Sequence, residues 1–85
     1  MRTEKEFVRT CQSRKLTPVV CKHGDGIALD KKGRPYIAIH SEGLVRVPLR
    51  SAVHRFMCGV LSREPWVPFE AGLERFTVML TKATA

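Results

Sequence analysis

The chain has 85 residues, a hydrophobic content of 44% and a formal net charge of +7. A chain of this length forms one small domain, residues 1–85, and its hydrophobic content argues against a wholly disordered protein. It contains neither the roughly 20-residue apolar run of a transmembrane helix nor the apolar region of a signal peptide, and its three widely spaced cysteines make no disulfide framework. These features predict a cytoplasmic protein with no membrane association.

The positive charge is concentrated in the first three quarters of the chain. Residues 1–63 contain 13 Lys or Arg against 5 Asp or Glu, whereas residues 64–85 contain 2 against 3. A basic surface attracts polyanions and acidic protein surfaces at long range. The composition therefore favours nucleic acid or an acidic protein as the partner. The alternative is that the excess charge only keeps a small protein in solution.

Residues 4–14 are predicted to form an amphipathic helix. Thr3 and Glu6 have the spacing of a capping box, with Thr3 as the N-cap residue. Phe7 and Cys11 lie on one stripe of this helix, while charged and polar residues lie opposite. The narrow apolar stripe would cover one part of a sheet.

The strand-forming part of the chain extends from residue 17 to residue 49. Residues 17–23 have β-branched character, and Pro18, which cannot donate to a β-ladder, places this strand at an edge of the sheet. Residues 26–49 read as three antiparallel strands joined by turns at Asp30–Gly33 and Ser41–Gly43. Each turn begins with Asp or Ser and ends with Gly, as in a type I turn closed by a glycine bulge.

Side chains of these strands alternate between two faces of the predicted sheet. The apolar face consists of Ile27, Leu29, Ile37, Ile39, Val45 and Val47. The opposite face carries Ala28, Tyr36, Ala38, His40 and Arg46. The apolar face needs a cover, so the opposite face is the one left for function.

A second helix, over residues 52–62, is predicted to supply that cover. Ser51 is positioned as its N-cap, and the helix ends before Pro65. A continuous apolar stripe runs along it, with Leu61 beside the stripe: Val53, Phe56, Met57 and Val60.

The end of the chain is ambiguous between helix and strand. Residues 63–69 form a loop stiffened by two prolines. In residues 70–82, Phe76 and Leu80 fall on one side of either element. The β-branched residues favour a strand over residues 75–81, and Gly72 weakens a long helix.

The predicted fold class is therefore α+β. Its order is an N-terminal helix, a four-stranded antiparallel meander, a packing helix and a C-terminal strand. Such a sheet could also curl or close into a small barrel, which would protect its edges.

The first candidate function is nucleic-acid binding by the polar sheet face and the basic turn. Aromatic and cationic side chains on an exposed sheet face can stack bases and contact phosphates. The candidate residues are Lys22, Lys31, Lys32, Arg34, Tyr36, His40 and Arg46. The alternative is that this face is solvated, or is covered by the first helix with Tyr36 half-buried.

The second candidate function is a protein-interaction or inhibitor module that docks on an acidic partner surface. Its size resembles that of the small accessory proteins of mobile elements. Arg55 is a candidate contact as part of the basic surface, and Trp66 is a candidate anchor because Trp is prominent in interface hot spots. Trp66 has a second interpretation, as a plug over the core. Either a monomer or a homodimer fits the sequence.

Four residues could together make a zinc site, because Cys21 and His23 share one side of a strand and His54 and Cys58 share one side of a helix. The Cys-x-His spacing is unusual for zinc, and free cysteine behaves as a small core hydrophobe. Cysteine catalysis would also need an oxyanion hole and an orienting acid, which no local motif supplies. We therefore expect no metal, no cofactor and no enzymatic activity.

Overall fold

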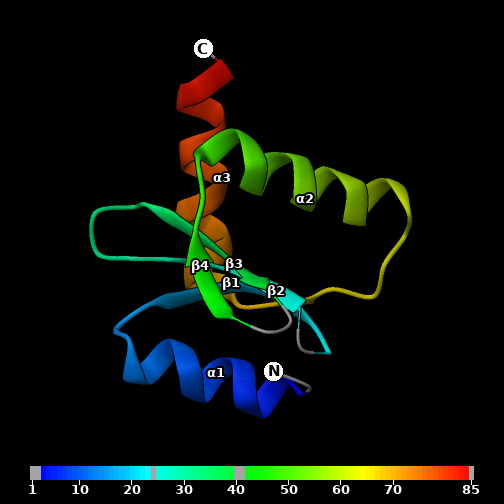
Figure 1. The fold of residues 1–85 in the computed structure, drawn as a ribbon. Helices are drawn as coiled ribbons and strands as arrows, with labels where there is room; N and C mark the ends of the chain where they lie inside the picture. The colour runs from blue at the N-terminus through cyan, green and yellow to red at the C-terminus, as the bar shows by residue number, and fades with distance from the viewer. Residues whose placement is uncertain (1–2, 24, 40–41, 85) are drawn as a thin grey trace.

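The structure is a computed structural model that describes residues 3–23, 25–39 and 42–84. These residues form three helices and five strands (Figure 1). In chain order they are α1 (Glu4–Ser13), β1 (Thr17–Lys22), β2 (Asp25–Leu29), β3 (Pro35–Ile39), β4 (Gly43–Arg46), α2 (Leu49–Leu61), β5 (Val67–Pro68) and α3 (Glu70–Thr84).

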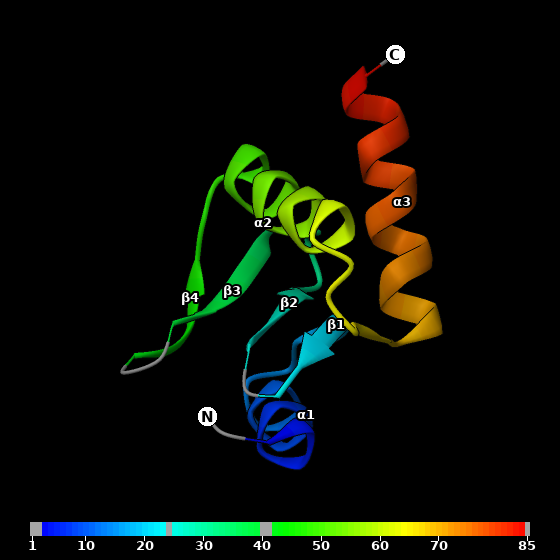
Figure 2. The ribbon, with the colours of Figure 1, turned by 90° about the vertical axis from the view of Figure 1, so that its right-hand side faces the viewer.

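The strands form one antiparallel sheet in the order β4-β3-β2-β1-β5. Helix α1 lies against one face of this sheet, and α2 lies over the other (Figures 1 and 2). Helix α3 stands beside the β1 end of the sheet, and its C-terminal half extends past α2 (Figure 2). The α+β prediction with a four-stranded meander is thus confirmed, whereas closure into a barrel is not, because β4 and β5 remain separate edges.

Helix α1 begins as its sequence predicts. The Thr3 hydroxyl accepts a hydrogen bond from the Glu6 amide at 3.1 Å, and this satisfies one of the free amides of the first turn. Phe7 and Cys11 are fully buried on the sheet, where they form a cluster with residues of three strands. The other members of this α1 cluster are Leu16, Cys21, Ala28 and Leu44, with Tyr36, Ala38 and Phe69 packed against them.

The second core cluster lies on the opposite face of the sheet, beneath α2 and α3. Ile27 and Leu29 of β2 are fully buried there, as the strand alternation predicts. Phe76 of α3 is also fully buried, and its ring meets Phe56 of α2 edge to face, with 5.4 Å between the centroids. Both helices therefore cover the face that α2 alone was predicted to cover.

The prediction of a C-terminal strand over residues 75–81 is wrong, because residues 70–84 are helical. The hydroxyls of Thr77 and Thr81 donate hydrogen bonds to carbonyls four residues earlier, at 2.8 and 3.0 Å, which accommodates these β-branched residues in a helix. Gly72 is needed for packing: a Cβ there would overlap the carbonyl oxygen of Pro18. The glycine thus lets α3 approach the β1 backbone.

Two smaller predictions also fail. Strand β1 is not an edge strand, because β5 pairs with it at Val20 and Cys21, beyond a bulge that follows Pro18. Ser51 is not the N-cap of α2, which starts two residues earlier, after Pro48, whose side chain makes no capping bond. The Pro48 carbonyl instead accepts hydrogen bonds from the amides of Ser51 and Ala52, at 3.0 and 3.3 Å.

The two turns of the meander have glycine in the left-handed region. Gly33 has φ 80° and Gly43 has φ 76°, as the glycine-bulge prediction requires. The first residue of the second turn, Ser41, lies outside the described residues.

The outer side of α2 is more exposed than its apolar stripe predicts. Met57, Val60 and Leu61 are 42%, 47% and 78% exposed, although the first two were expected to cover the sheet. The reason is that α3 occupies much of the sheet face and contributes Phe76 to the core.

We predict that Gly72→Ala destabilises the protein, although alanine is the better helix former. The added methyl group would collide with the Pro18 carbonyl, so α3 would have to move off β1, and such overpacking costs about 1–3 kcal/mol of unfolding free energy. Urea denaturation measures this change. Ala71→Gly, at an exposed position of the same turn, calibrates helix propensity. If helix propensity alone determined stability, Gly72→Ala would raise the unfolding free energy by about the amount that Ala71→Gly lowers it. That result would contradict the prediction.

Candidate functional site

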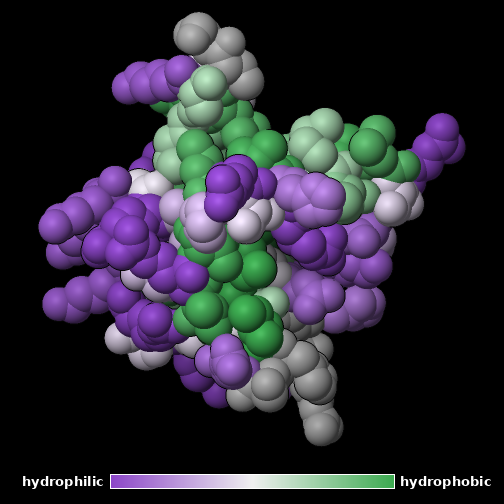
Figure 3. Space-filling view, turned by 45° about the horizontal axis from the view of Figure 1, so that its top comes forward, coloured by the Kyte–Doolittle hydropathy of each residue, from purple (hydrophilic) through white to green (hydrophobic). Residues whose placement is uncertain are grey.

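A cleft of about 290 Å³ lies between the end of α1 and the turn from β2 to β3, and we call it the basic cleft. Five cationic side chains and one carboxylate line it. The lining residues are Arg14, Lys15, Leu16, Asp30, Lys31, Lys32, Arg34 and Tyr36. Figure 3 shows hydrophilic side chains gathered on the side of the molecule from which the β2–β3 turn projects in Figure 1.

The strand register assembles this cleft from two separate segments. Thr17 pairs with Leu29 at the start of β1, so the residues before Thr17 and after Leu29 lie at the same end of the sheet. The Lys15 backbone is in the left-handed region, at φ 57°, where the chain leaves α1 and turns into β1. The last turn of α1 is therefore placed beside the β2–β3 turn.

Asp30 makes several hydrogen bonds among the residues that line the cleft. Its Oδ1 accepts hydrogen bonds from the amides of Lys32 and Arg34, both at 2.9 Å. Its Oδ2 lies 2.6 Å from Nε of Arg34 and accepts a longer bond from the Tyr36 hydroxyl at 3.4 Å. Burial acts to raise the pKa of this carboxyl, but the hydrogen bonds from Arg34 and Lys32 and the Arg34 charge outweigh it, so the pKa is lowered.

Helix α3 supports the same turn from the other layer. The Arg75 guanidinium donates to the Asp30 carbonyl at 2.8 Å and to the Thr17 hydroxyl at 3.0 Å. The Arg75 side chain thus connects α3 to the start of β1 and to the residue that follows β2. The turn that carries Lys31 and Lys32 is therefore held on a rigid base, while both lysines stay exposed.

The wall that α1 contributes is held in place by Arg14. Its guanidinium donates to the Leu44 carbonyl and lies over the Tyr36 ring, 5.4 Å from the centroid. Tyr36 and Ala38 both pack against the α1 cluster. Tyr36 is therefore half-buried and does not stand on an open sheet face. The surface available near Tyr36 is therefore the cleft at its edge.

The structure brings together four of the seven residues predicted for nucleic-acid binding, Lys31, Lys32, Arg34 and Tyr36. Arg46 is exposed on β4, directly opposite Tyr36 in the register, so it lies on the same side of the sheet. Lys22 lines a different cavity, and His40 lies outside the described residues.

Sequence reasoning missed the two basic residues that follow α1, Arg14 and Lys15. Neither was among the residues predicted to bind nucleic acid. The signal that could have placed them is the meander itself. Antiparallel pairing of residues 17–23 with the next strand puts the residues before Thr17 beside the turn at Asp30–Gly33.

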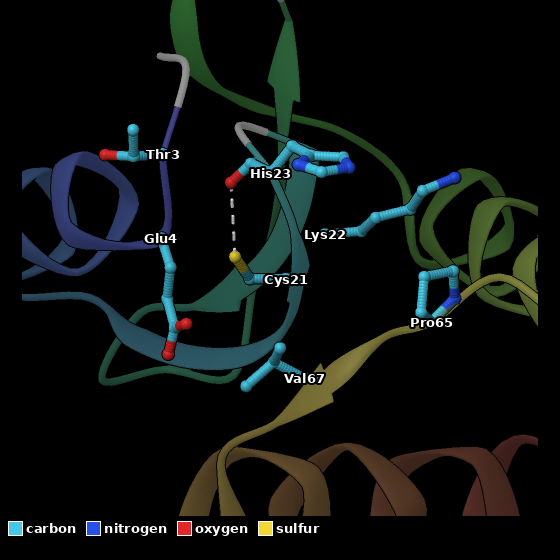
Figure 4. A pocket seen from close by; sticks show the side chains of 7 residues that line it. All are labelled: Thr3, Glu4, Cys21, Lys22, His23, Pro65 and Val67. Carbon is cyan, nitrogen blue, oxygen red and sulfur yellow. Dashed lines mark hydrogen bonds between the residues drawn. The ribbon is translucent and has the colours of Figure 1, made fainter.

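A second cavity, of about 310 Å³, lies between the start of α1 and the segment leading into β5 (Figure 4). Its lining includes Cys21, whose thiol is turned toward the His23 carbonyl oxygen at 3.4 Å. Burial is the main cause that raises the pKa of the Cys21 thiol to about 11, and the charges of Glu4 and Asp25 act in the same direction. The thiol is thus protonated at neutral pH and is a poor nucleophile.

The two Cys–His pairs do not come together as a zinc site. Cys21 belongs to the α1 cluster, whereas Cys58 is exposed on α2, on the other side of the sheet, with its sulfur 3.5 Å from Nε2 of His54. Among the residues that the structure describes, no three or more His, Cys, Asp or Glu side chains are grouped as metal ligands.

The two residues proposed for a protein partner contact each other within the fold. The Arg55 guanidinium lies over the Trp66 ring, 4.8 Å from the centroid, and forms an ion pair with Glu64 at 3.2 Å. Trp66 packs against the second core cluster and fills the space beside Gly59, where a side chain would overlap its indole. This arrangement is the one expected for a plug over the core.

Comparisons with known proteins found no match: no family model fits this sequence, and neither the curated proteins nor the solved structures include one that is significantly similar. Within the described ranges, none of the helices combines the length and the apolar composition needed to cross a membrane.

We predict that Asp30→Asn lowers the unfolding free energy at neutral pH. The difference in unfolding free energy between this variant and the unchanged protein should become smaller in acid. A folded pKa below the unfolded value of about 3.9 means that the ionised carboxylate is the stabilising form. That stabilisation is present above the unfolded pKa and is lost as the pH falls through the folded pKa. Urea denaturation at pH 7 and at several values below pH 4 measures this convergence.

Asp25→Asn is the control for this experiment, because it removes one carboxylate at the start of β2 whose side chain is 61% exposed. A stability difference between Asp30→Asn and the unchanged protein that stays constant down to pH 2 would contradict the role given to the charge of Asp30.

Proposed function

We propose that this protein binds nucleic acid through the basic cleft, by contacts between its cationic side chains and backbone phosphates. The observation that carries the proposal is the convergence of five cationic side chains from two segments on one cleft that contains a single carboxylate. Asp30 is already engaged by Arg34 and by two backbone amides, which leaves the exposed lysines to face a ligand.

The shape of the cleft supports contacts with a nucleic-acid backbone more than stacking of bases. Tyr36 is the aromatic residue that lines it, and Arg14 already covers the face of its ring. Lys15, Lys31 and Lys32 are exposed point charges on short turns. Contacts of this kind fix position along a strand and carry little sequence information. The expected activity is therefore binding with weak sequence preference and strong dependence on salt.

An acidic protein surface is the alternative occupant of the same cleft, since charge attracts both kinds of partner. Nucleic acid is favoured because five cationic side chains and only one carboxylate line the cleft, so its surface can contact several phosphates of one strand. An acidic protein would be recovered in a stable complex after nuclease treatment. A nucleic acid ligand would be lost in that treatment.

We predict that the purified protein binds single- or double-stranded oligonucleotides at about 50 mM salt, and that affinity falls steeply as salt rises. Contacts with three or four phosphates give a slope of log K against log salt concentration of about −2 to −4. The double variant Lys31→Ala/Lys32→Ala should bind more weakly and reduce the steepness of this slope by about 2. Fluorescence anisotropy of labelled oligonucleotides measures both quantities.

The matched control is Lys5→Ala/Lys82→Ala, which removes the same charge from exposed positions on α1 and α3. It should retain most of the affinity, because neither lysine lines the basic cleft. Equal losses in the two double variants would show that net charge governs binding and would contradict a site at the cleft. No binding to any oligonucleotide at low salt would overturn the proposed function.

A further inference from the structure

An apolar groove of about 460 Å³ lies between the N-terminal half of α2 and the C-terminal half of α3, and it shares no lining residue with the basic cleft. The Phe56–Phe76 contact joins the two helices within the second core cluster. The C-terminal half of α3 extends past α2 (Figure 2). The groove is lined by Leu49, Arg50, Val53 and His54 of α2 and by Leu80 and Ala83 of α3. Figure 3 looks toward this side of the molecule and shows hydrophobic side chains over both helices.

The apolar surface continues along α2 beyond the groove. Met57 and Leu61 follow Arg50 and His54 at helical spacing, so they extend the same side of the helix. Both are exposed, and Leu61 is the most exposed of the large hydrophobic side chains, at 78%. A contiguous apolar surface of this kind, rimmed by polar groups, marks an interaction site.

The charges around the groove all have one sign. The sequence of α2 contains no Asp or Glu, and neither does α3 from Arg75 to its end. Arg50 lines the groove, and Lys82 is exposed next to Ala83, which lines it on the other side. Among the described residues no carboxylate lines the groove.

We propose that this groove binds an acidic amphipathic helix of a partner protein. The aliphatic walls would take the apolar face of that helix, while Arg50, which lines the groove, would pair with its carboxylates. A second copy of this chain is a poorer occupant, because it brings its own +7 charge and has only cationic side chains around the matching surface. The 13 residues of α2 extend over about 20 Å, which matches a partner helix of about four turns.

A peptide library tests this proposal directly. The library fixes leucine at positions i, i+3, i+4 and i+7 of a 16-residue helical peptide and places acidic, basic or neutral polar residues at random elsewhere. Selection against the full-length protein should enrich peptides of net negative charge. The best of them is then synthesised together with a version in which every Asp and Glu is replaced by Lys, and both are titrated by fluorescence anisotropy.

Variants place the binding on the groove. Ala83→Glu puts a charge into an exposed lining position without disturbing the core, and should weaken the acidic peptide by at least about tenfold. Arg50→Glu/Lys82→Glu, which reverses the arginine that lines the groove and the lysine that precedes Ala83, should weaken it by about tenfold. The matched control Lys5→Glu/Arg9→Glu changes net charge equally on α1 and should leave binding within about twofold. Circular dichroism verifies that each variant is folded.

A further variant separates this proposal from the proposed function. Lys31→Glu/Lys32→Glu should abolish oligonucleotide binding and leave peptide binding within about twofold, because these residues do not line the groove. Peptide binding that is lost in this variant and kept in Ala83→Glu would place the acidic helix in the basic cleft and overturn the proposal. Enrichment of neutral or basic peptides, or of none, would also overturn it. So would a dimer in sedimentation analysis that Ala83→Glu dissociates, since a second copy would then be the occupant.

Discussion

The arrangement of the side chains around the basic cleft depends on the interactions of the Asp30 carboxylate. It closes the β2–β3 turn through two backbone amides and neutralises Arg34, and the carbonyl of the same residue receives Arg75 from α3. A buried carboxylate needs such partners, because an unpaired charge away from water is strongly unfavourable. One residue thus fixes the shape of the turn and connects it to the opposite layer of the fold. The exposed lysines of the turn owe their defined positions to it.

The sheet separates the molecule into two halves with different chemistry. On the α1 side, the helix covers most of the sheet face, and the remaining opening is basic. On the other side, α2 and α3 share the cover and leave an apolar groove with Arg50 in its lining. The two proposed sites share no lining residue.

Much of the sheet could be predicted from the sequence, because its signals are local. The turn glycines, the period-two alternation around Ile27 and Leu29, and the Thr3 cap are each set by residues close in the chain. The C-terminal segment could not be predicted in this way. Its threonines favour a strand by propensity, and only packing of Phe76 on the sheet and of Gly72 on the Pro18 carbonyl selects the helix. The basic cleft was predicted only in part. Lys31 and Lys32 of the turn were identified, whereas Arg14 and Lys15 were missed because only the tertiary structure brings them to the cleft.

The link from Arg75 to Thr17 has a consequence for the order in which the chain can fold. Strands β1 to β4 are each paired with their neighbours in sequence, so their contacts close short loops. Arg75 and Thr17 are 58 positions apart, and joining them closes a long loop at a greater entropic cost. The meander can therefore form before α3 docks on β1. A nascent chain would carry the β2–β3 turn in native form first, and the groove between α2 and α3 would be completed only when the C-terminal helix arrives.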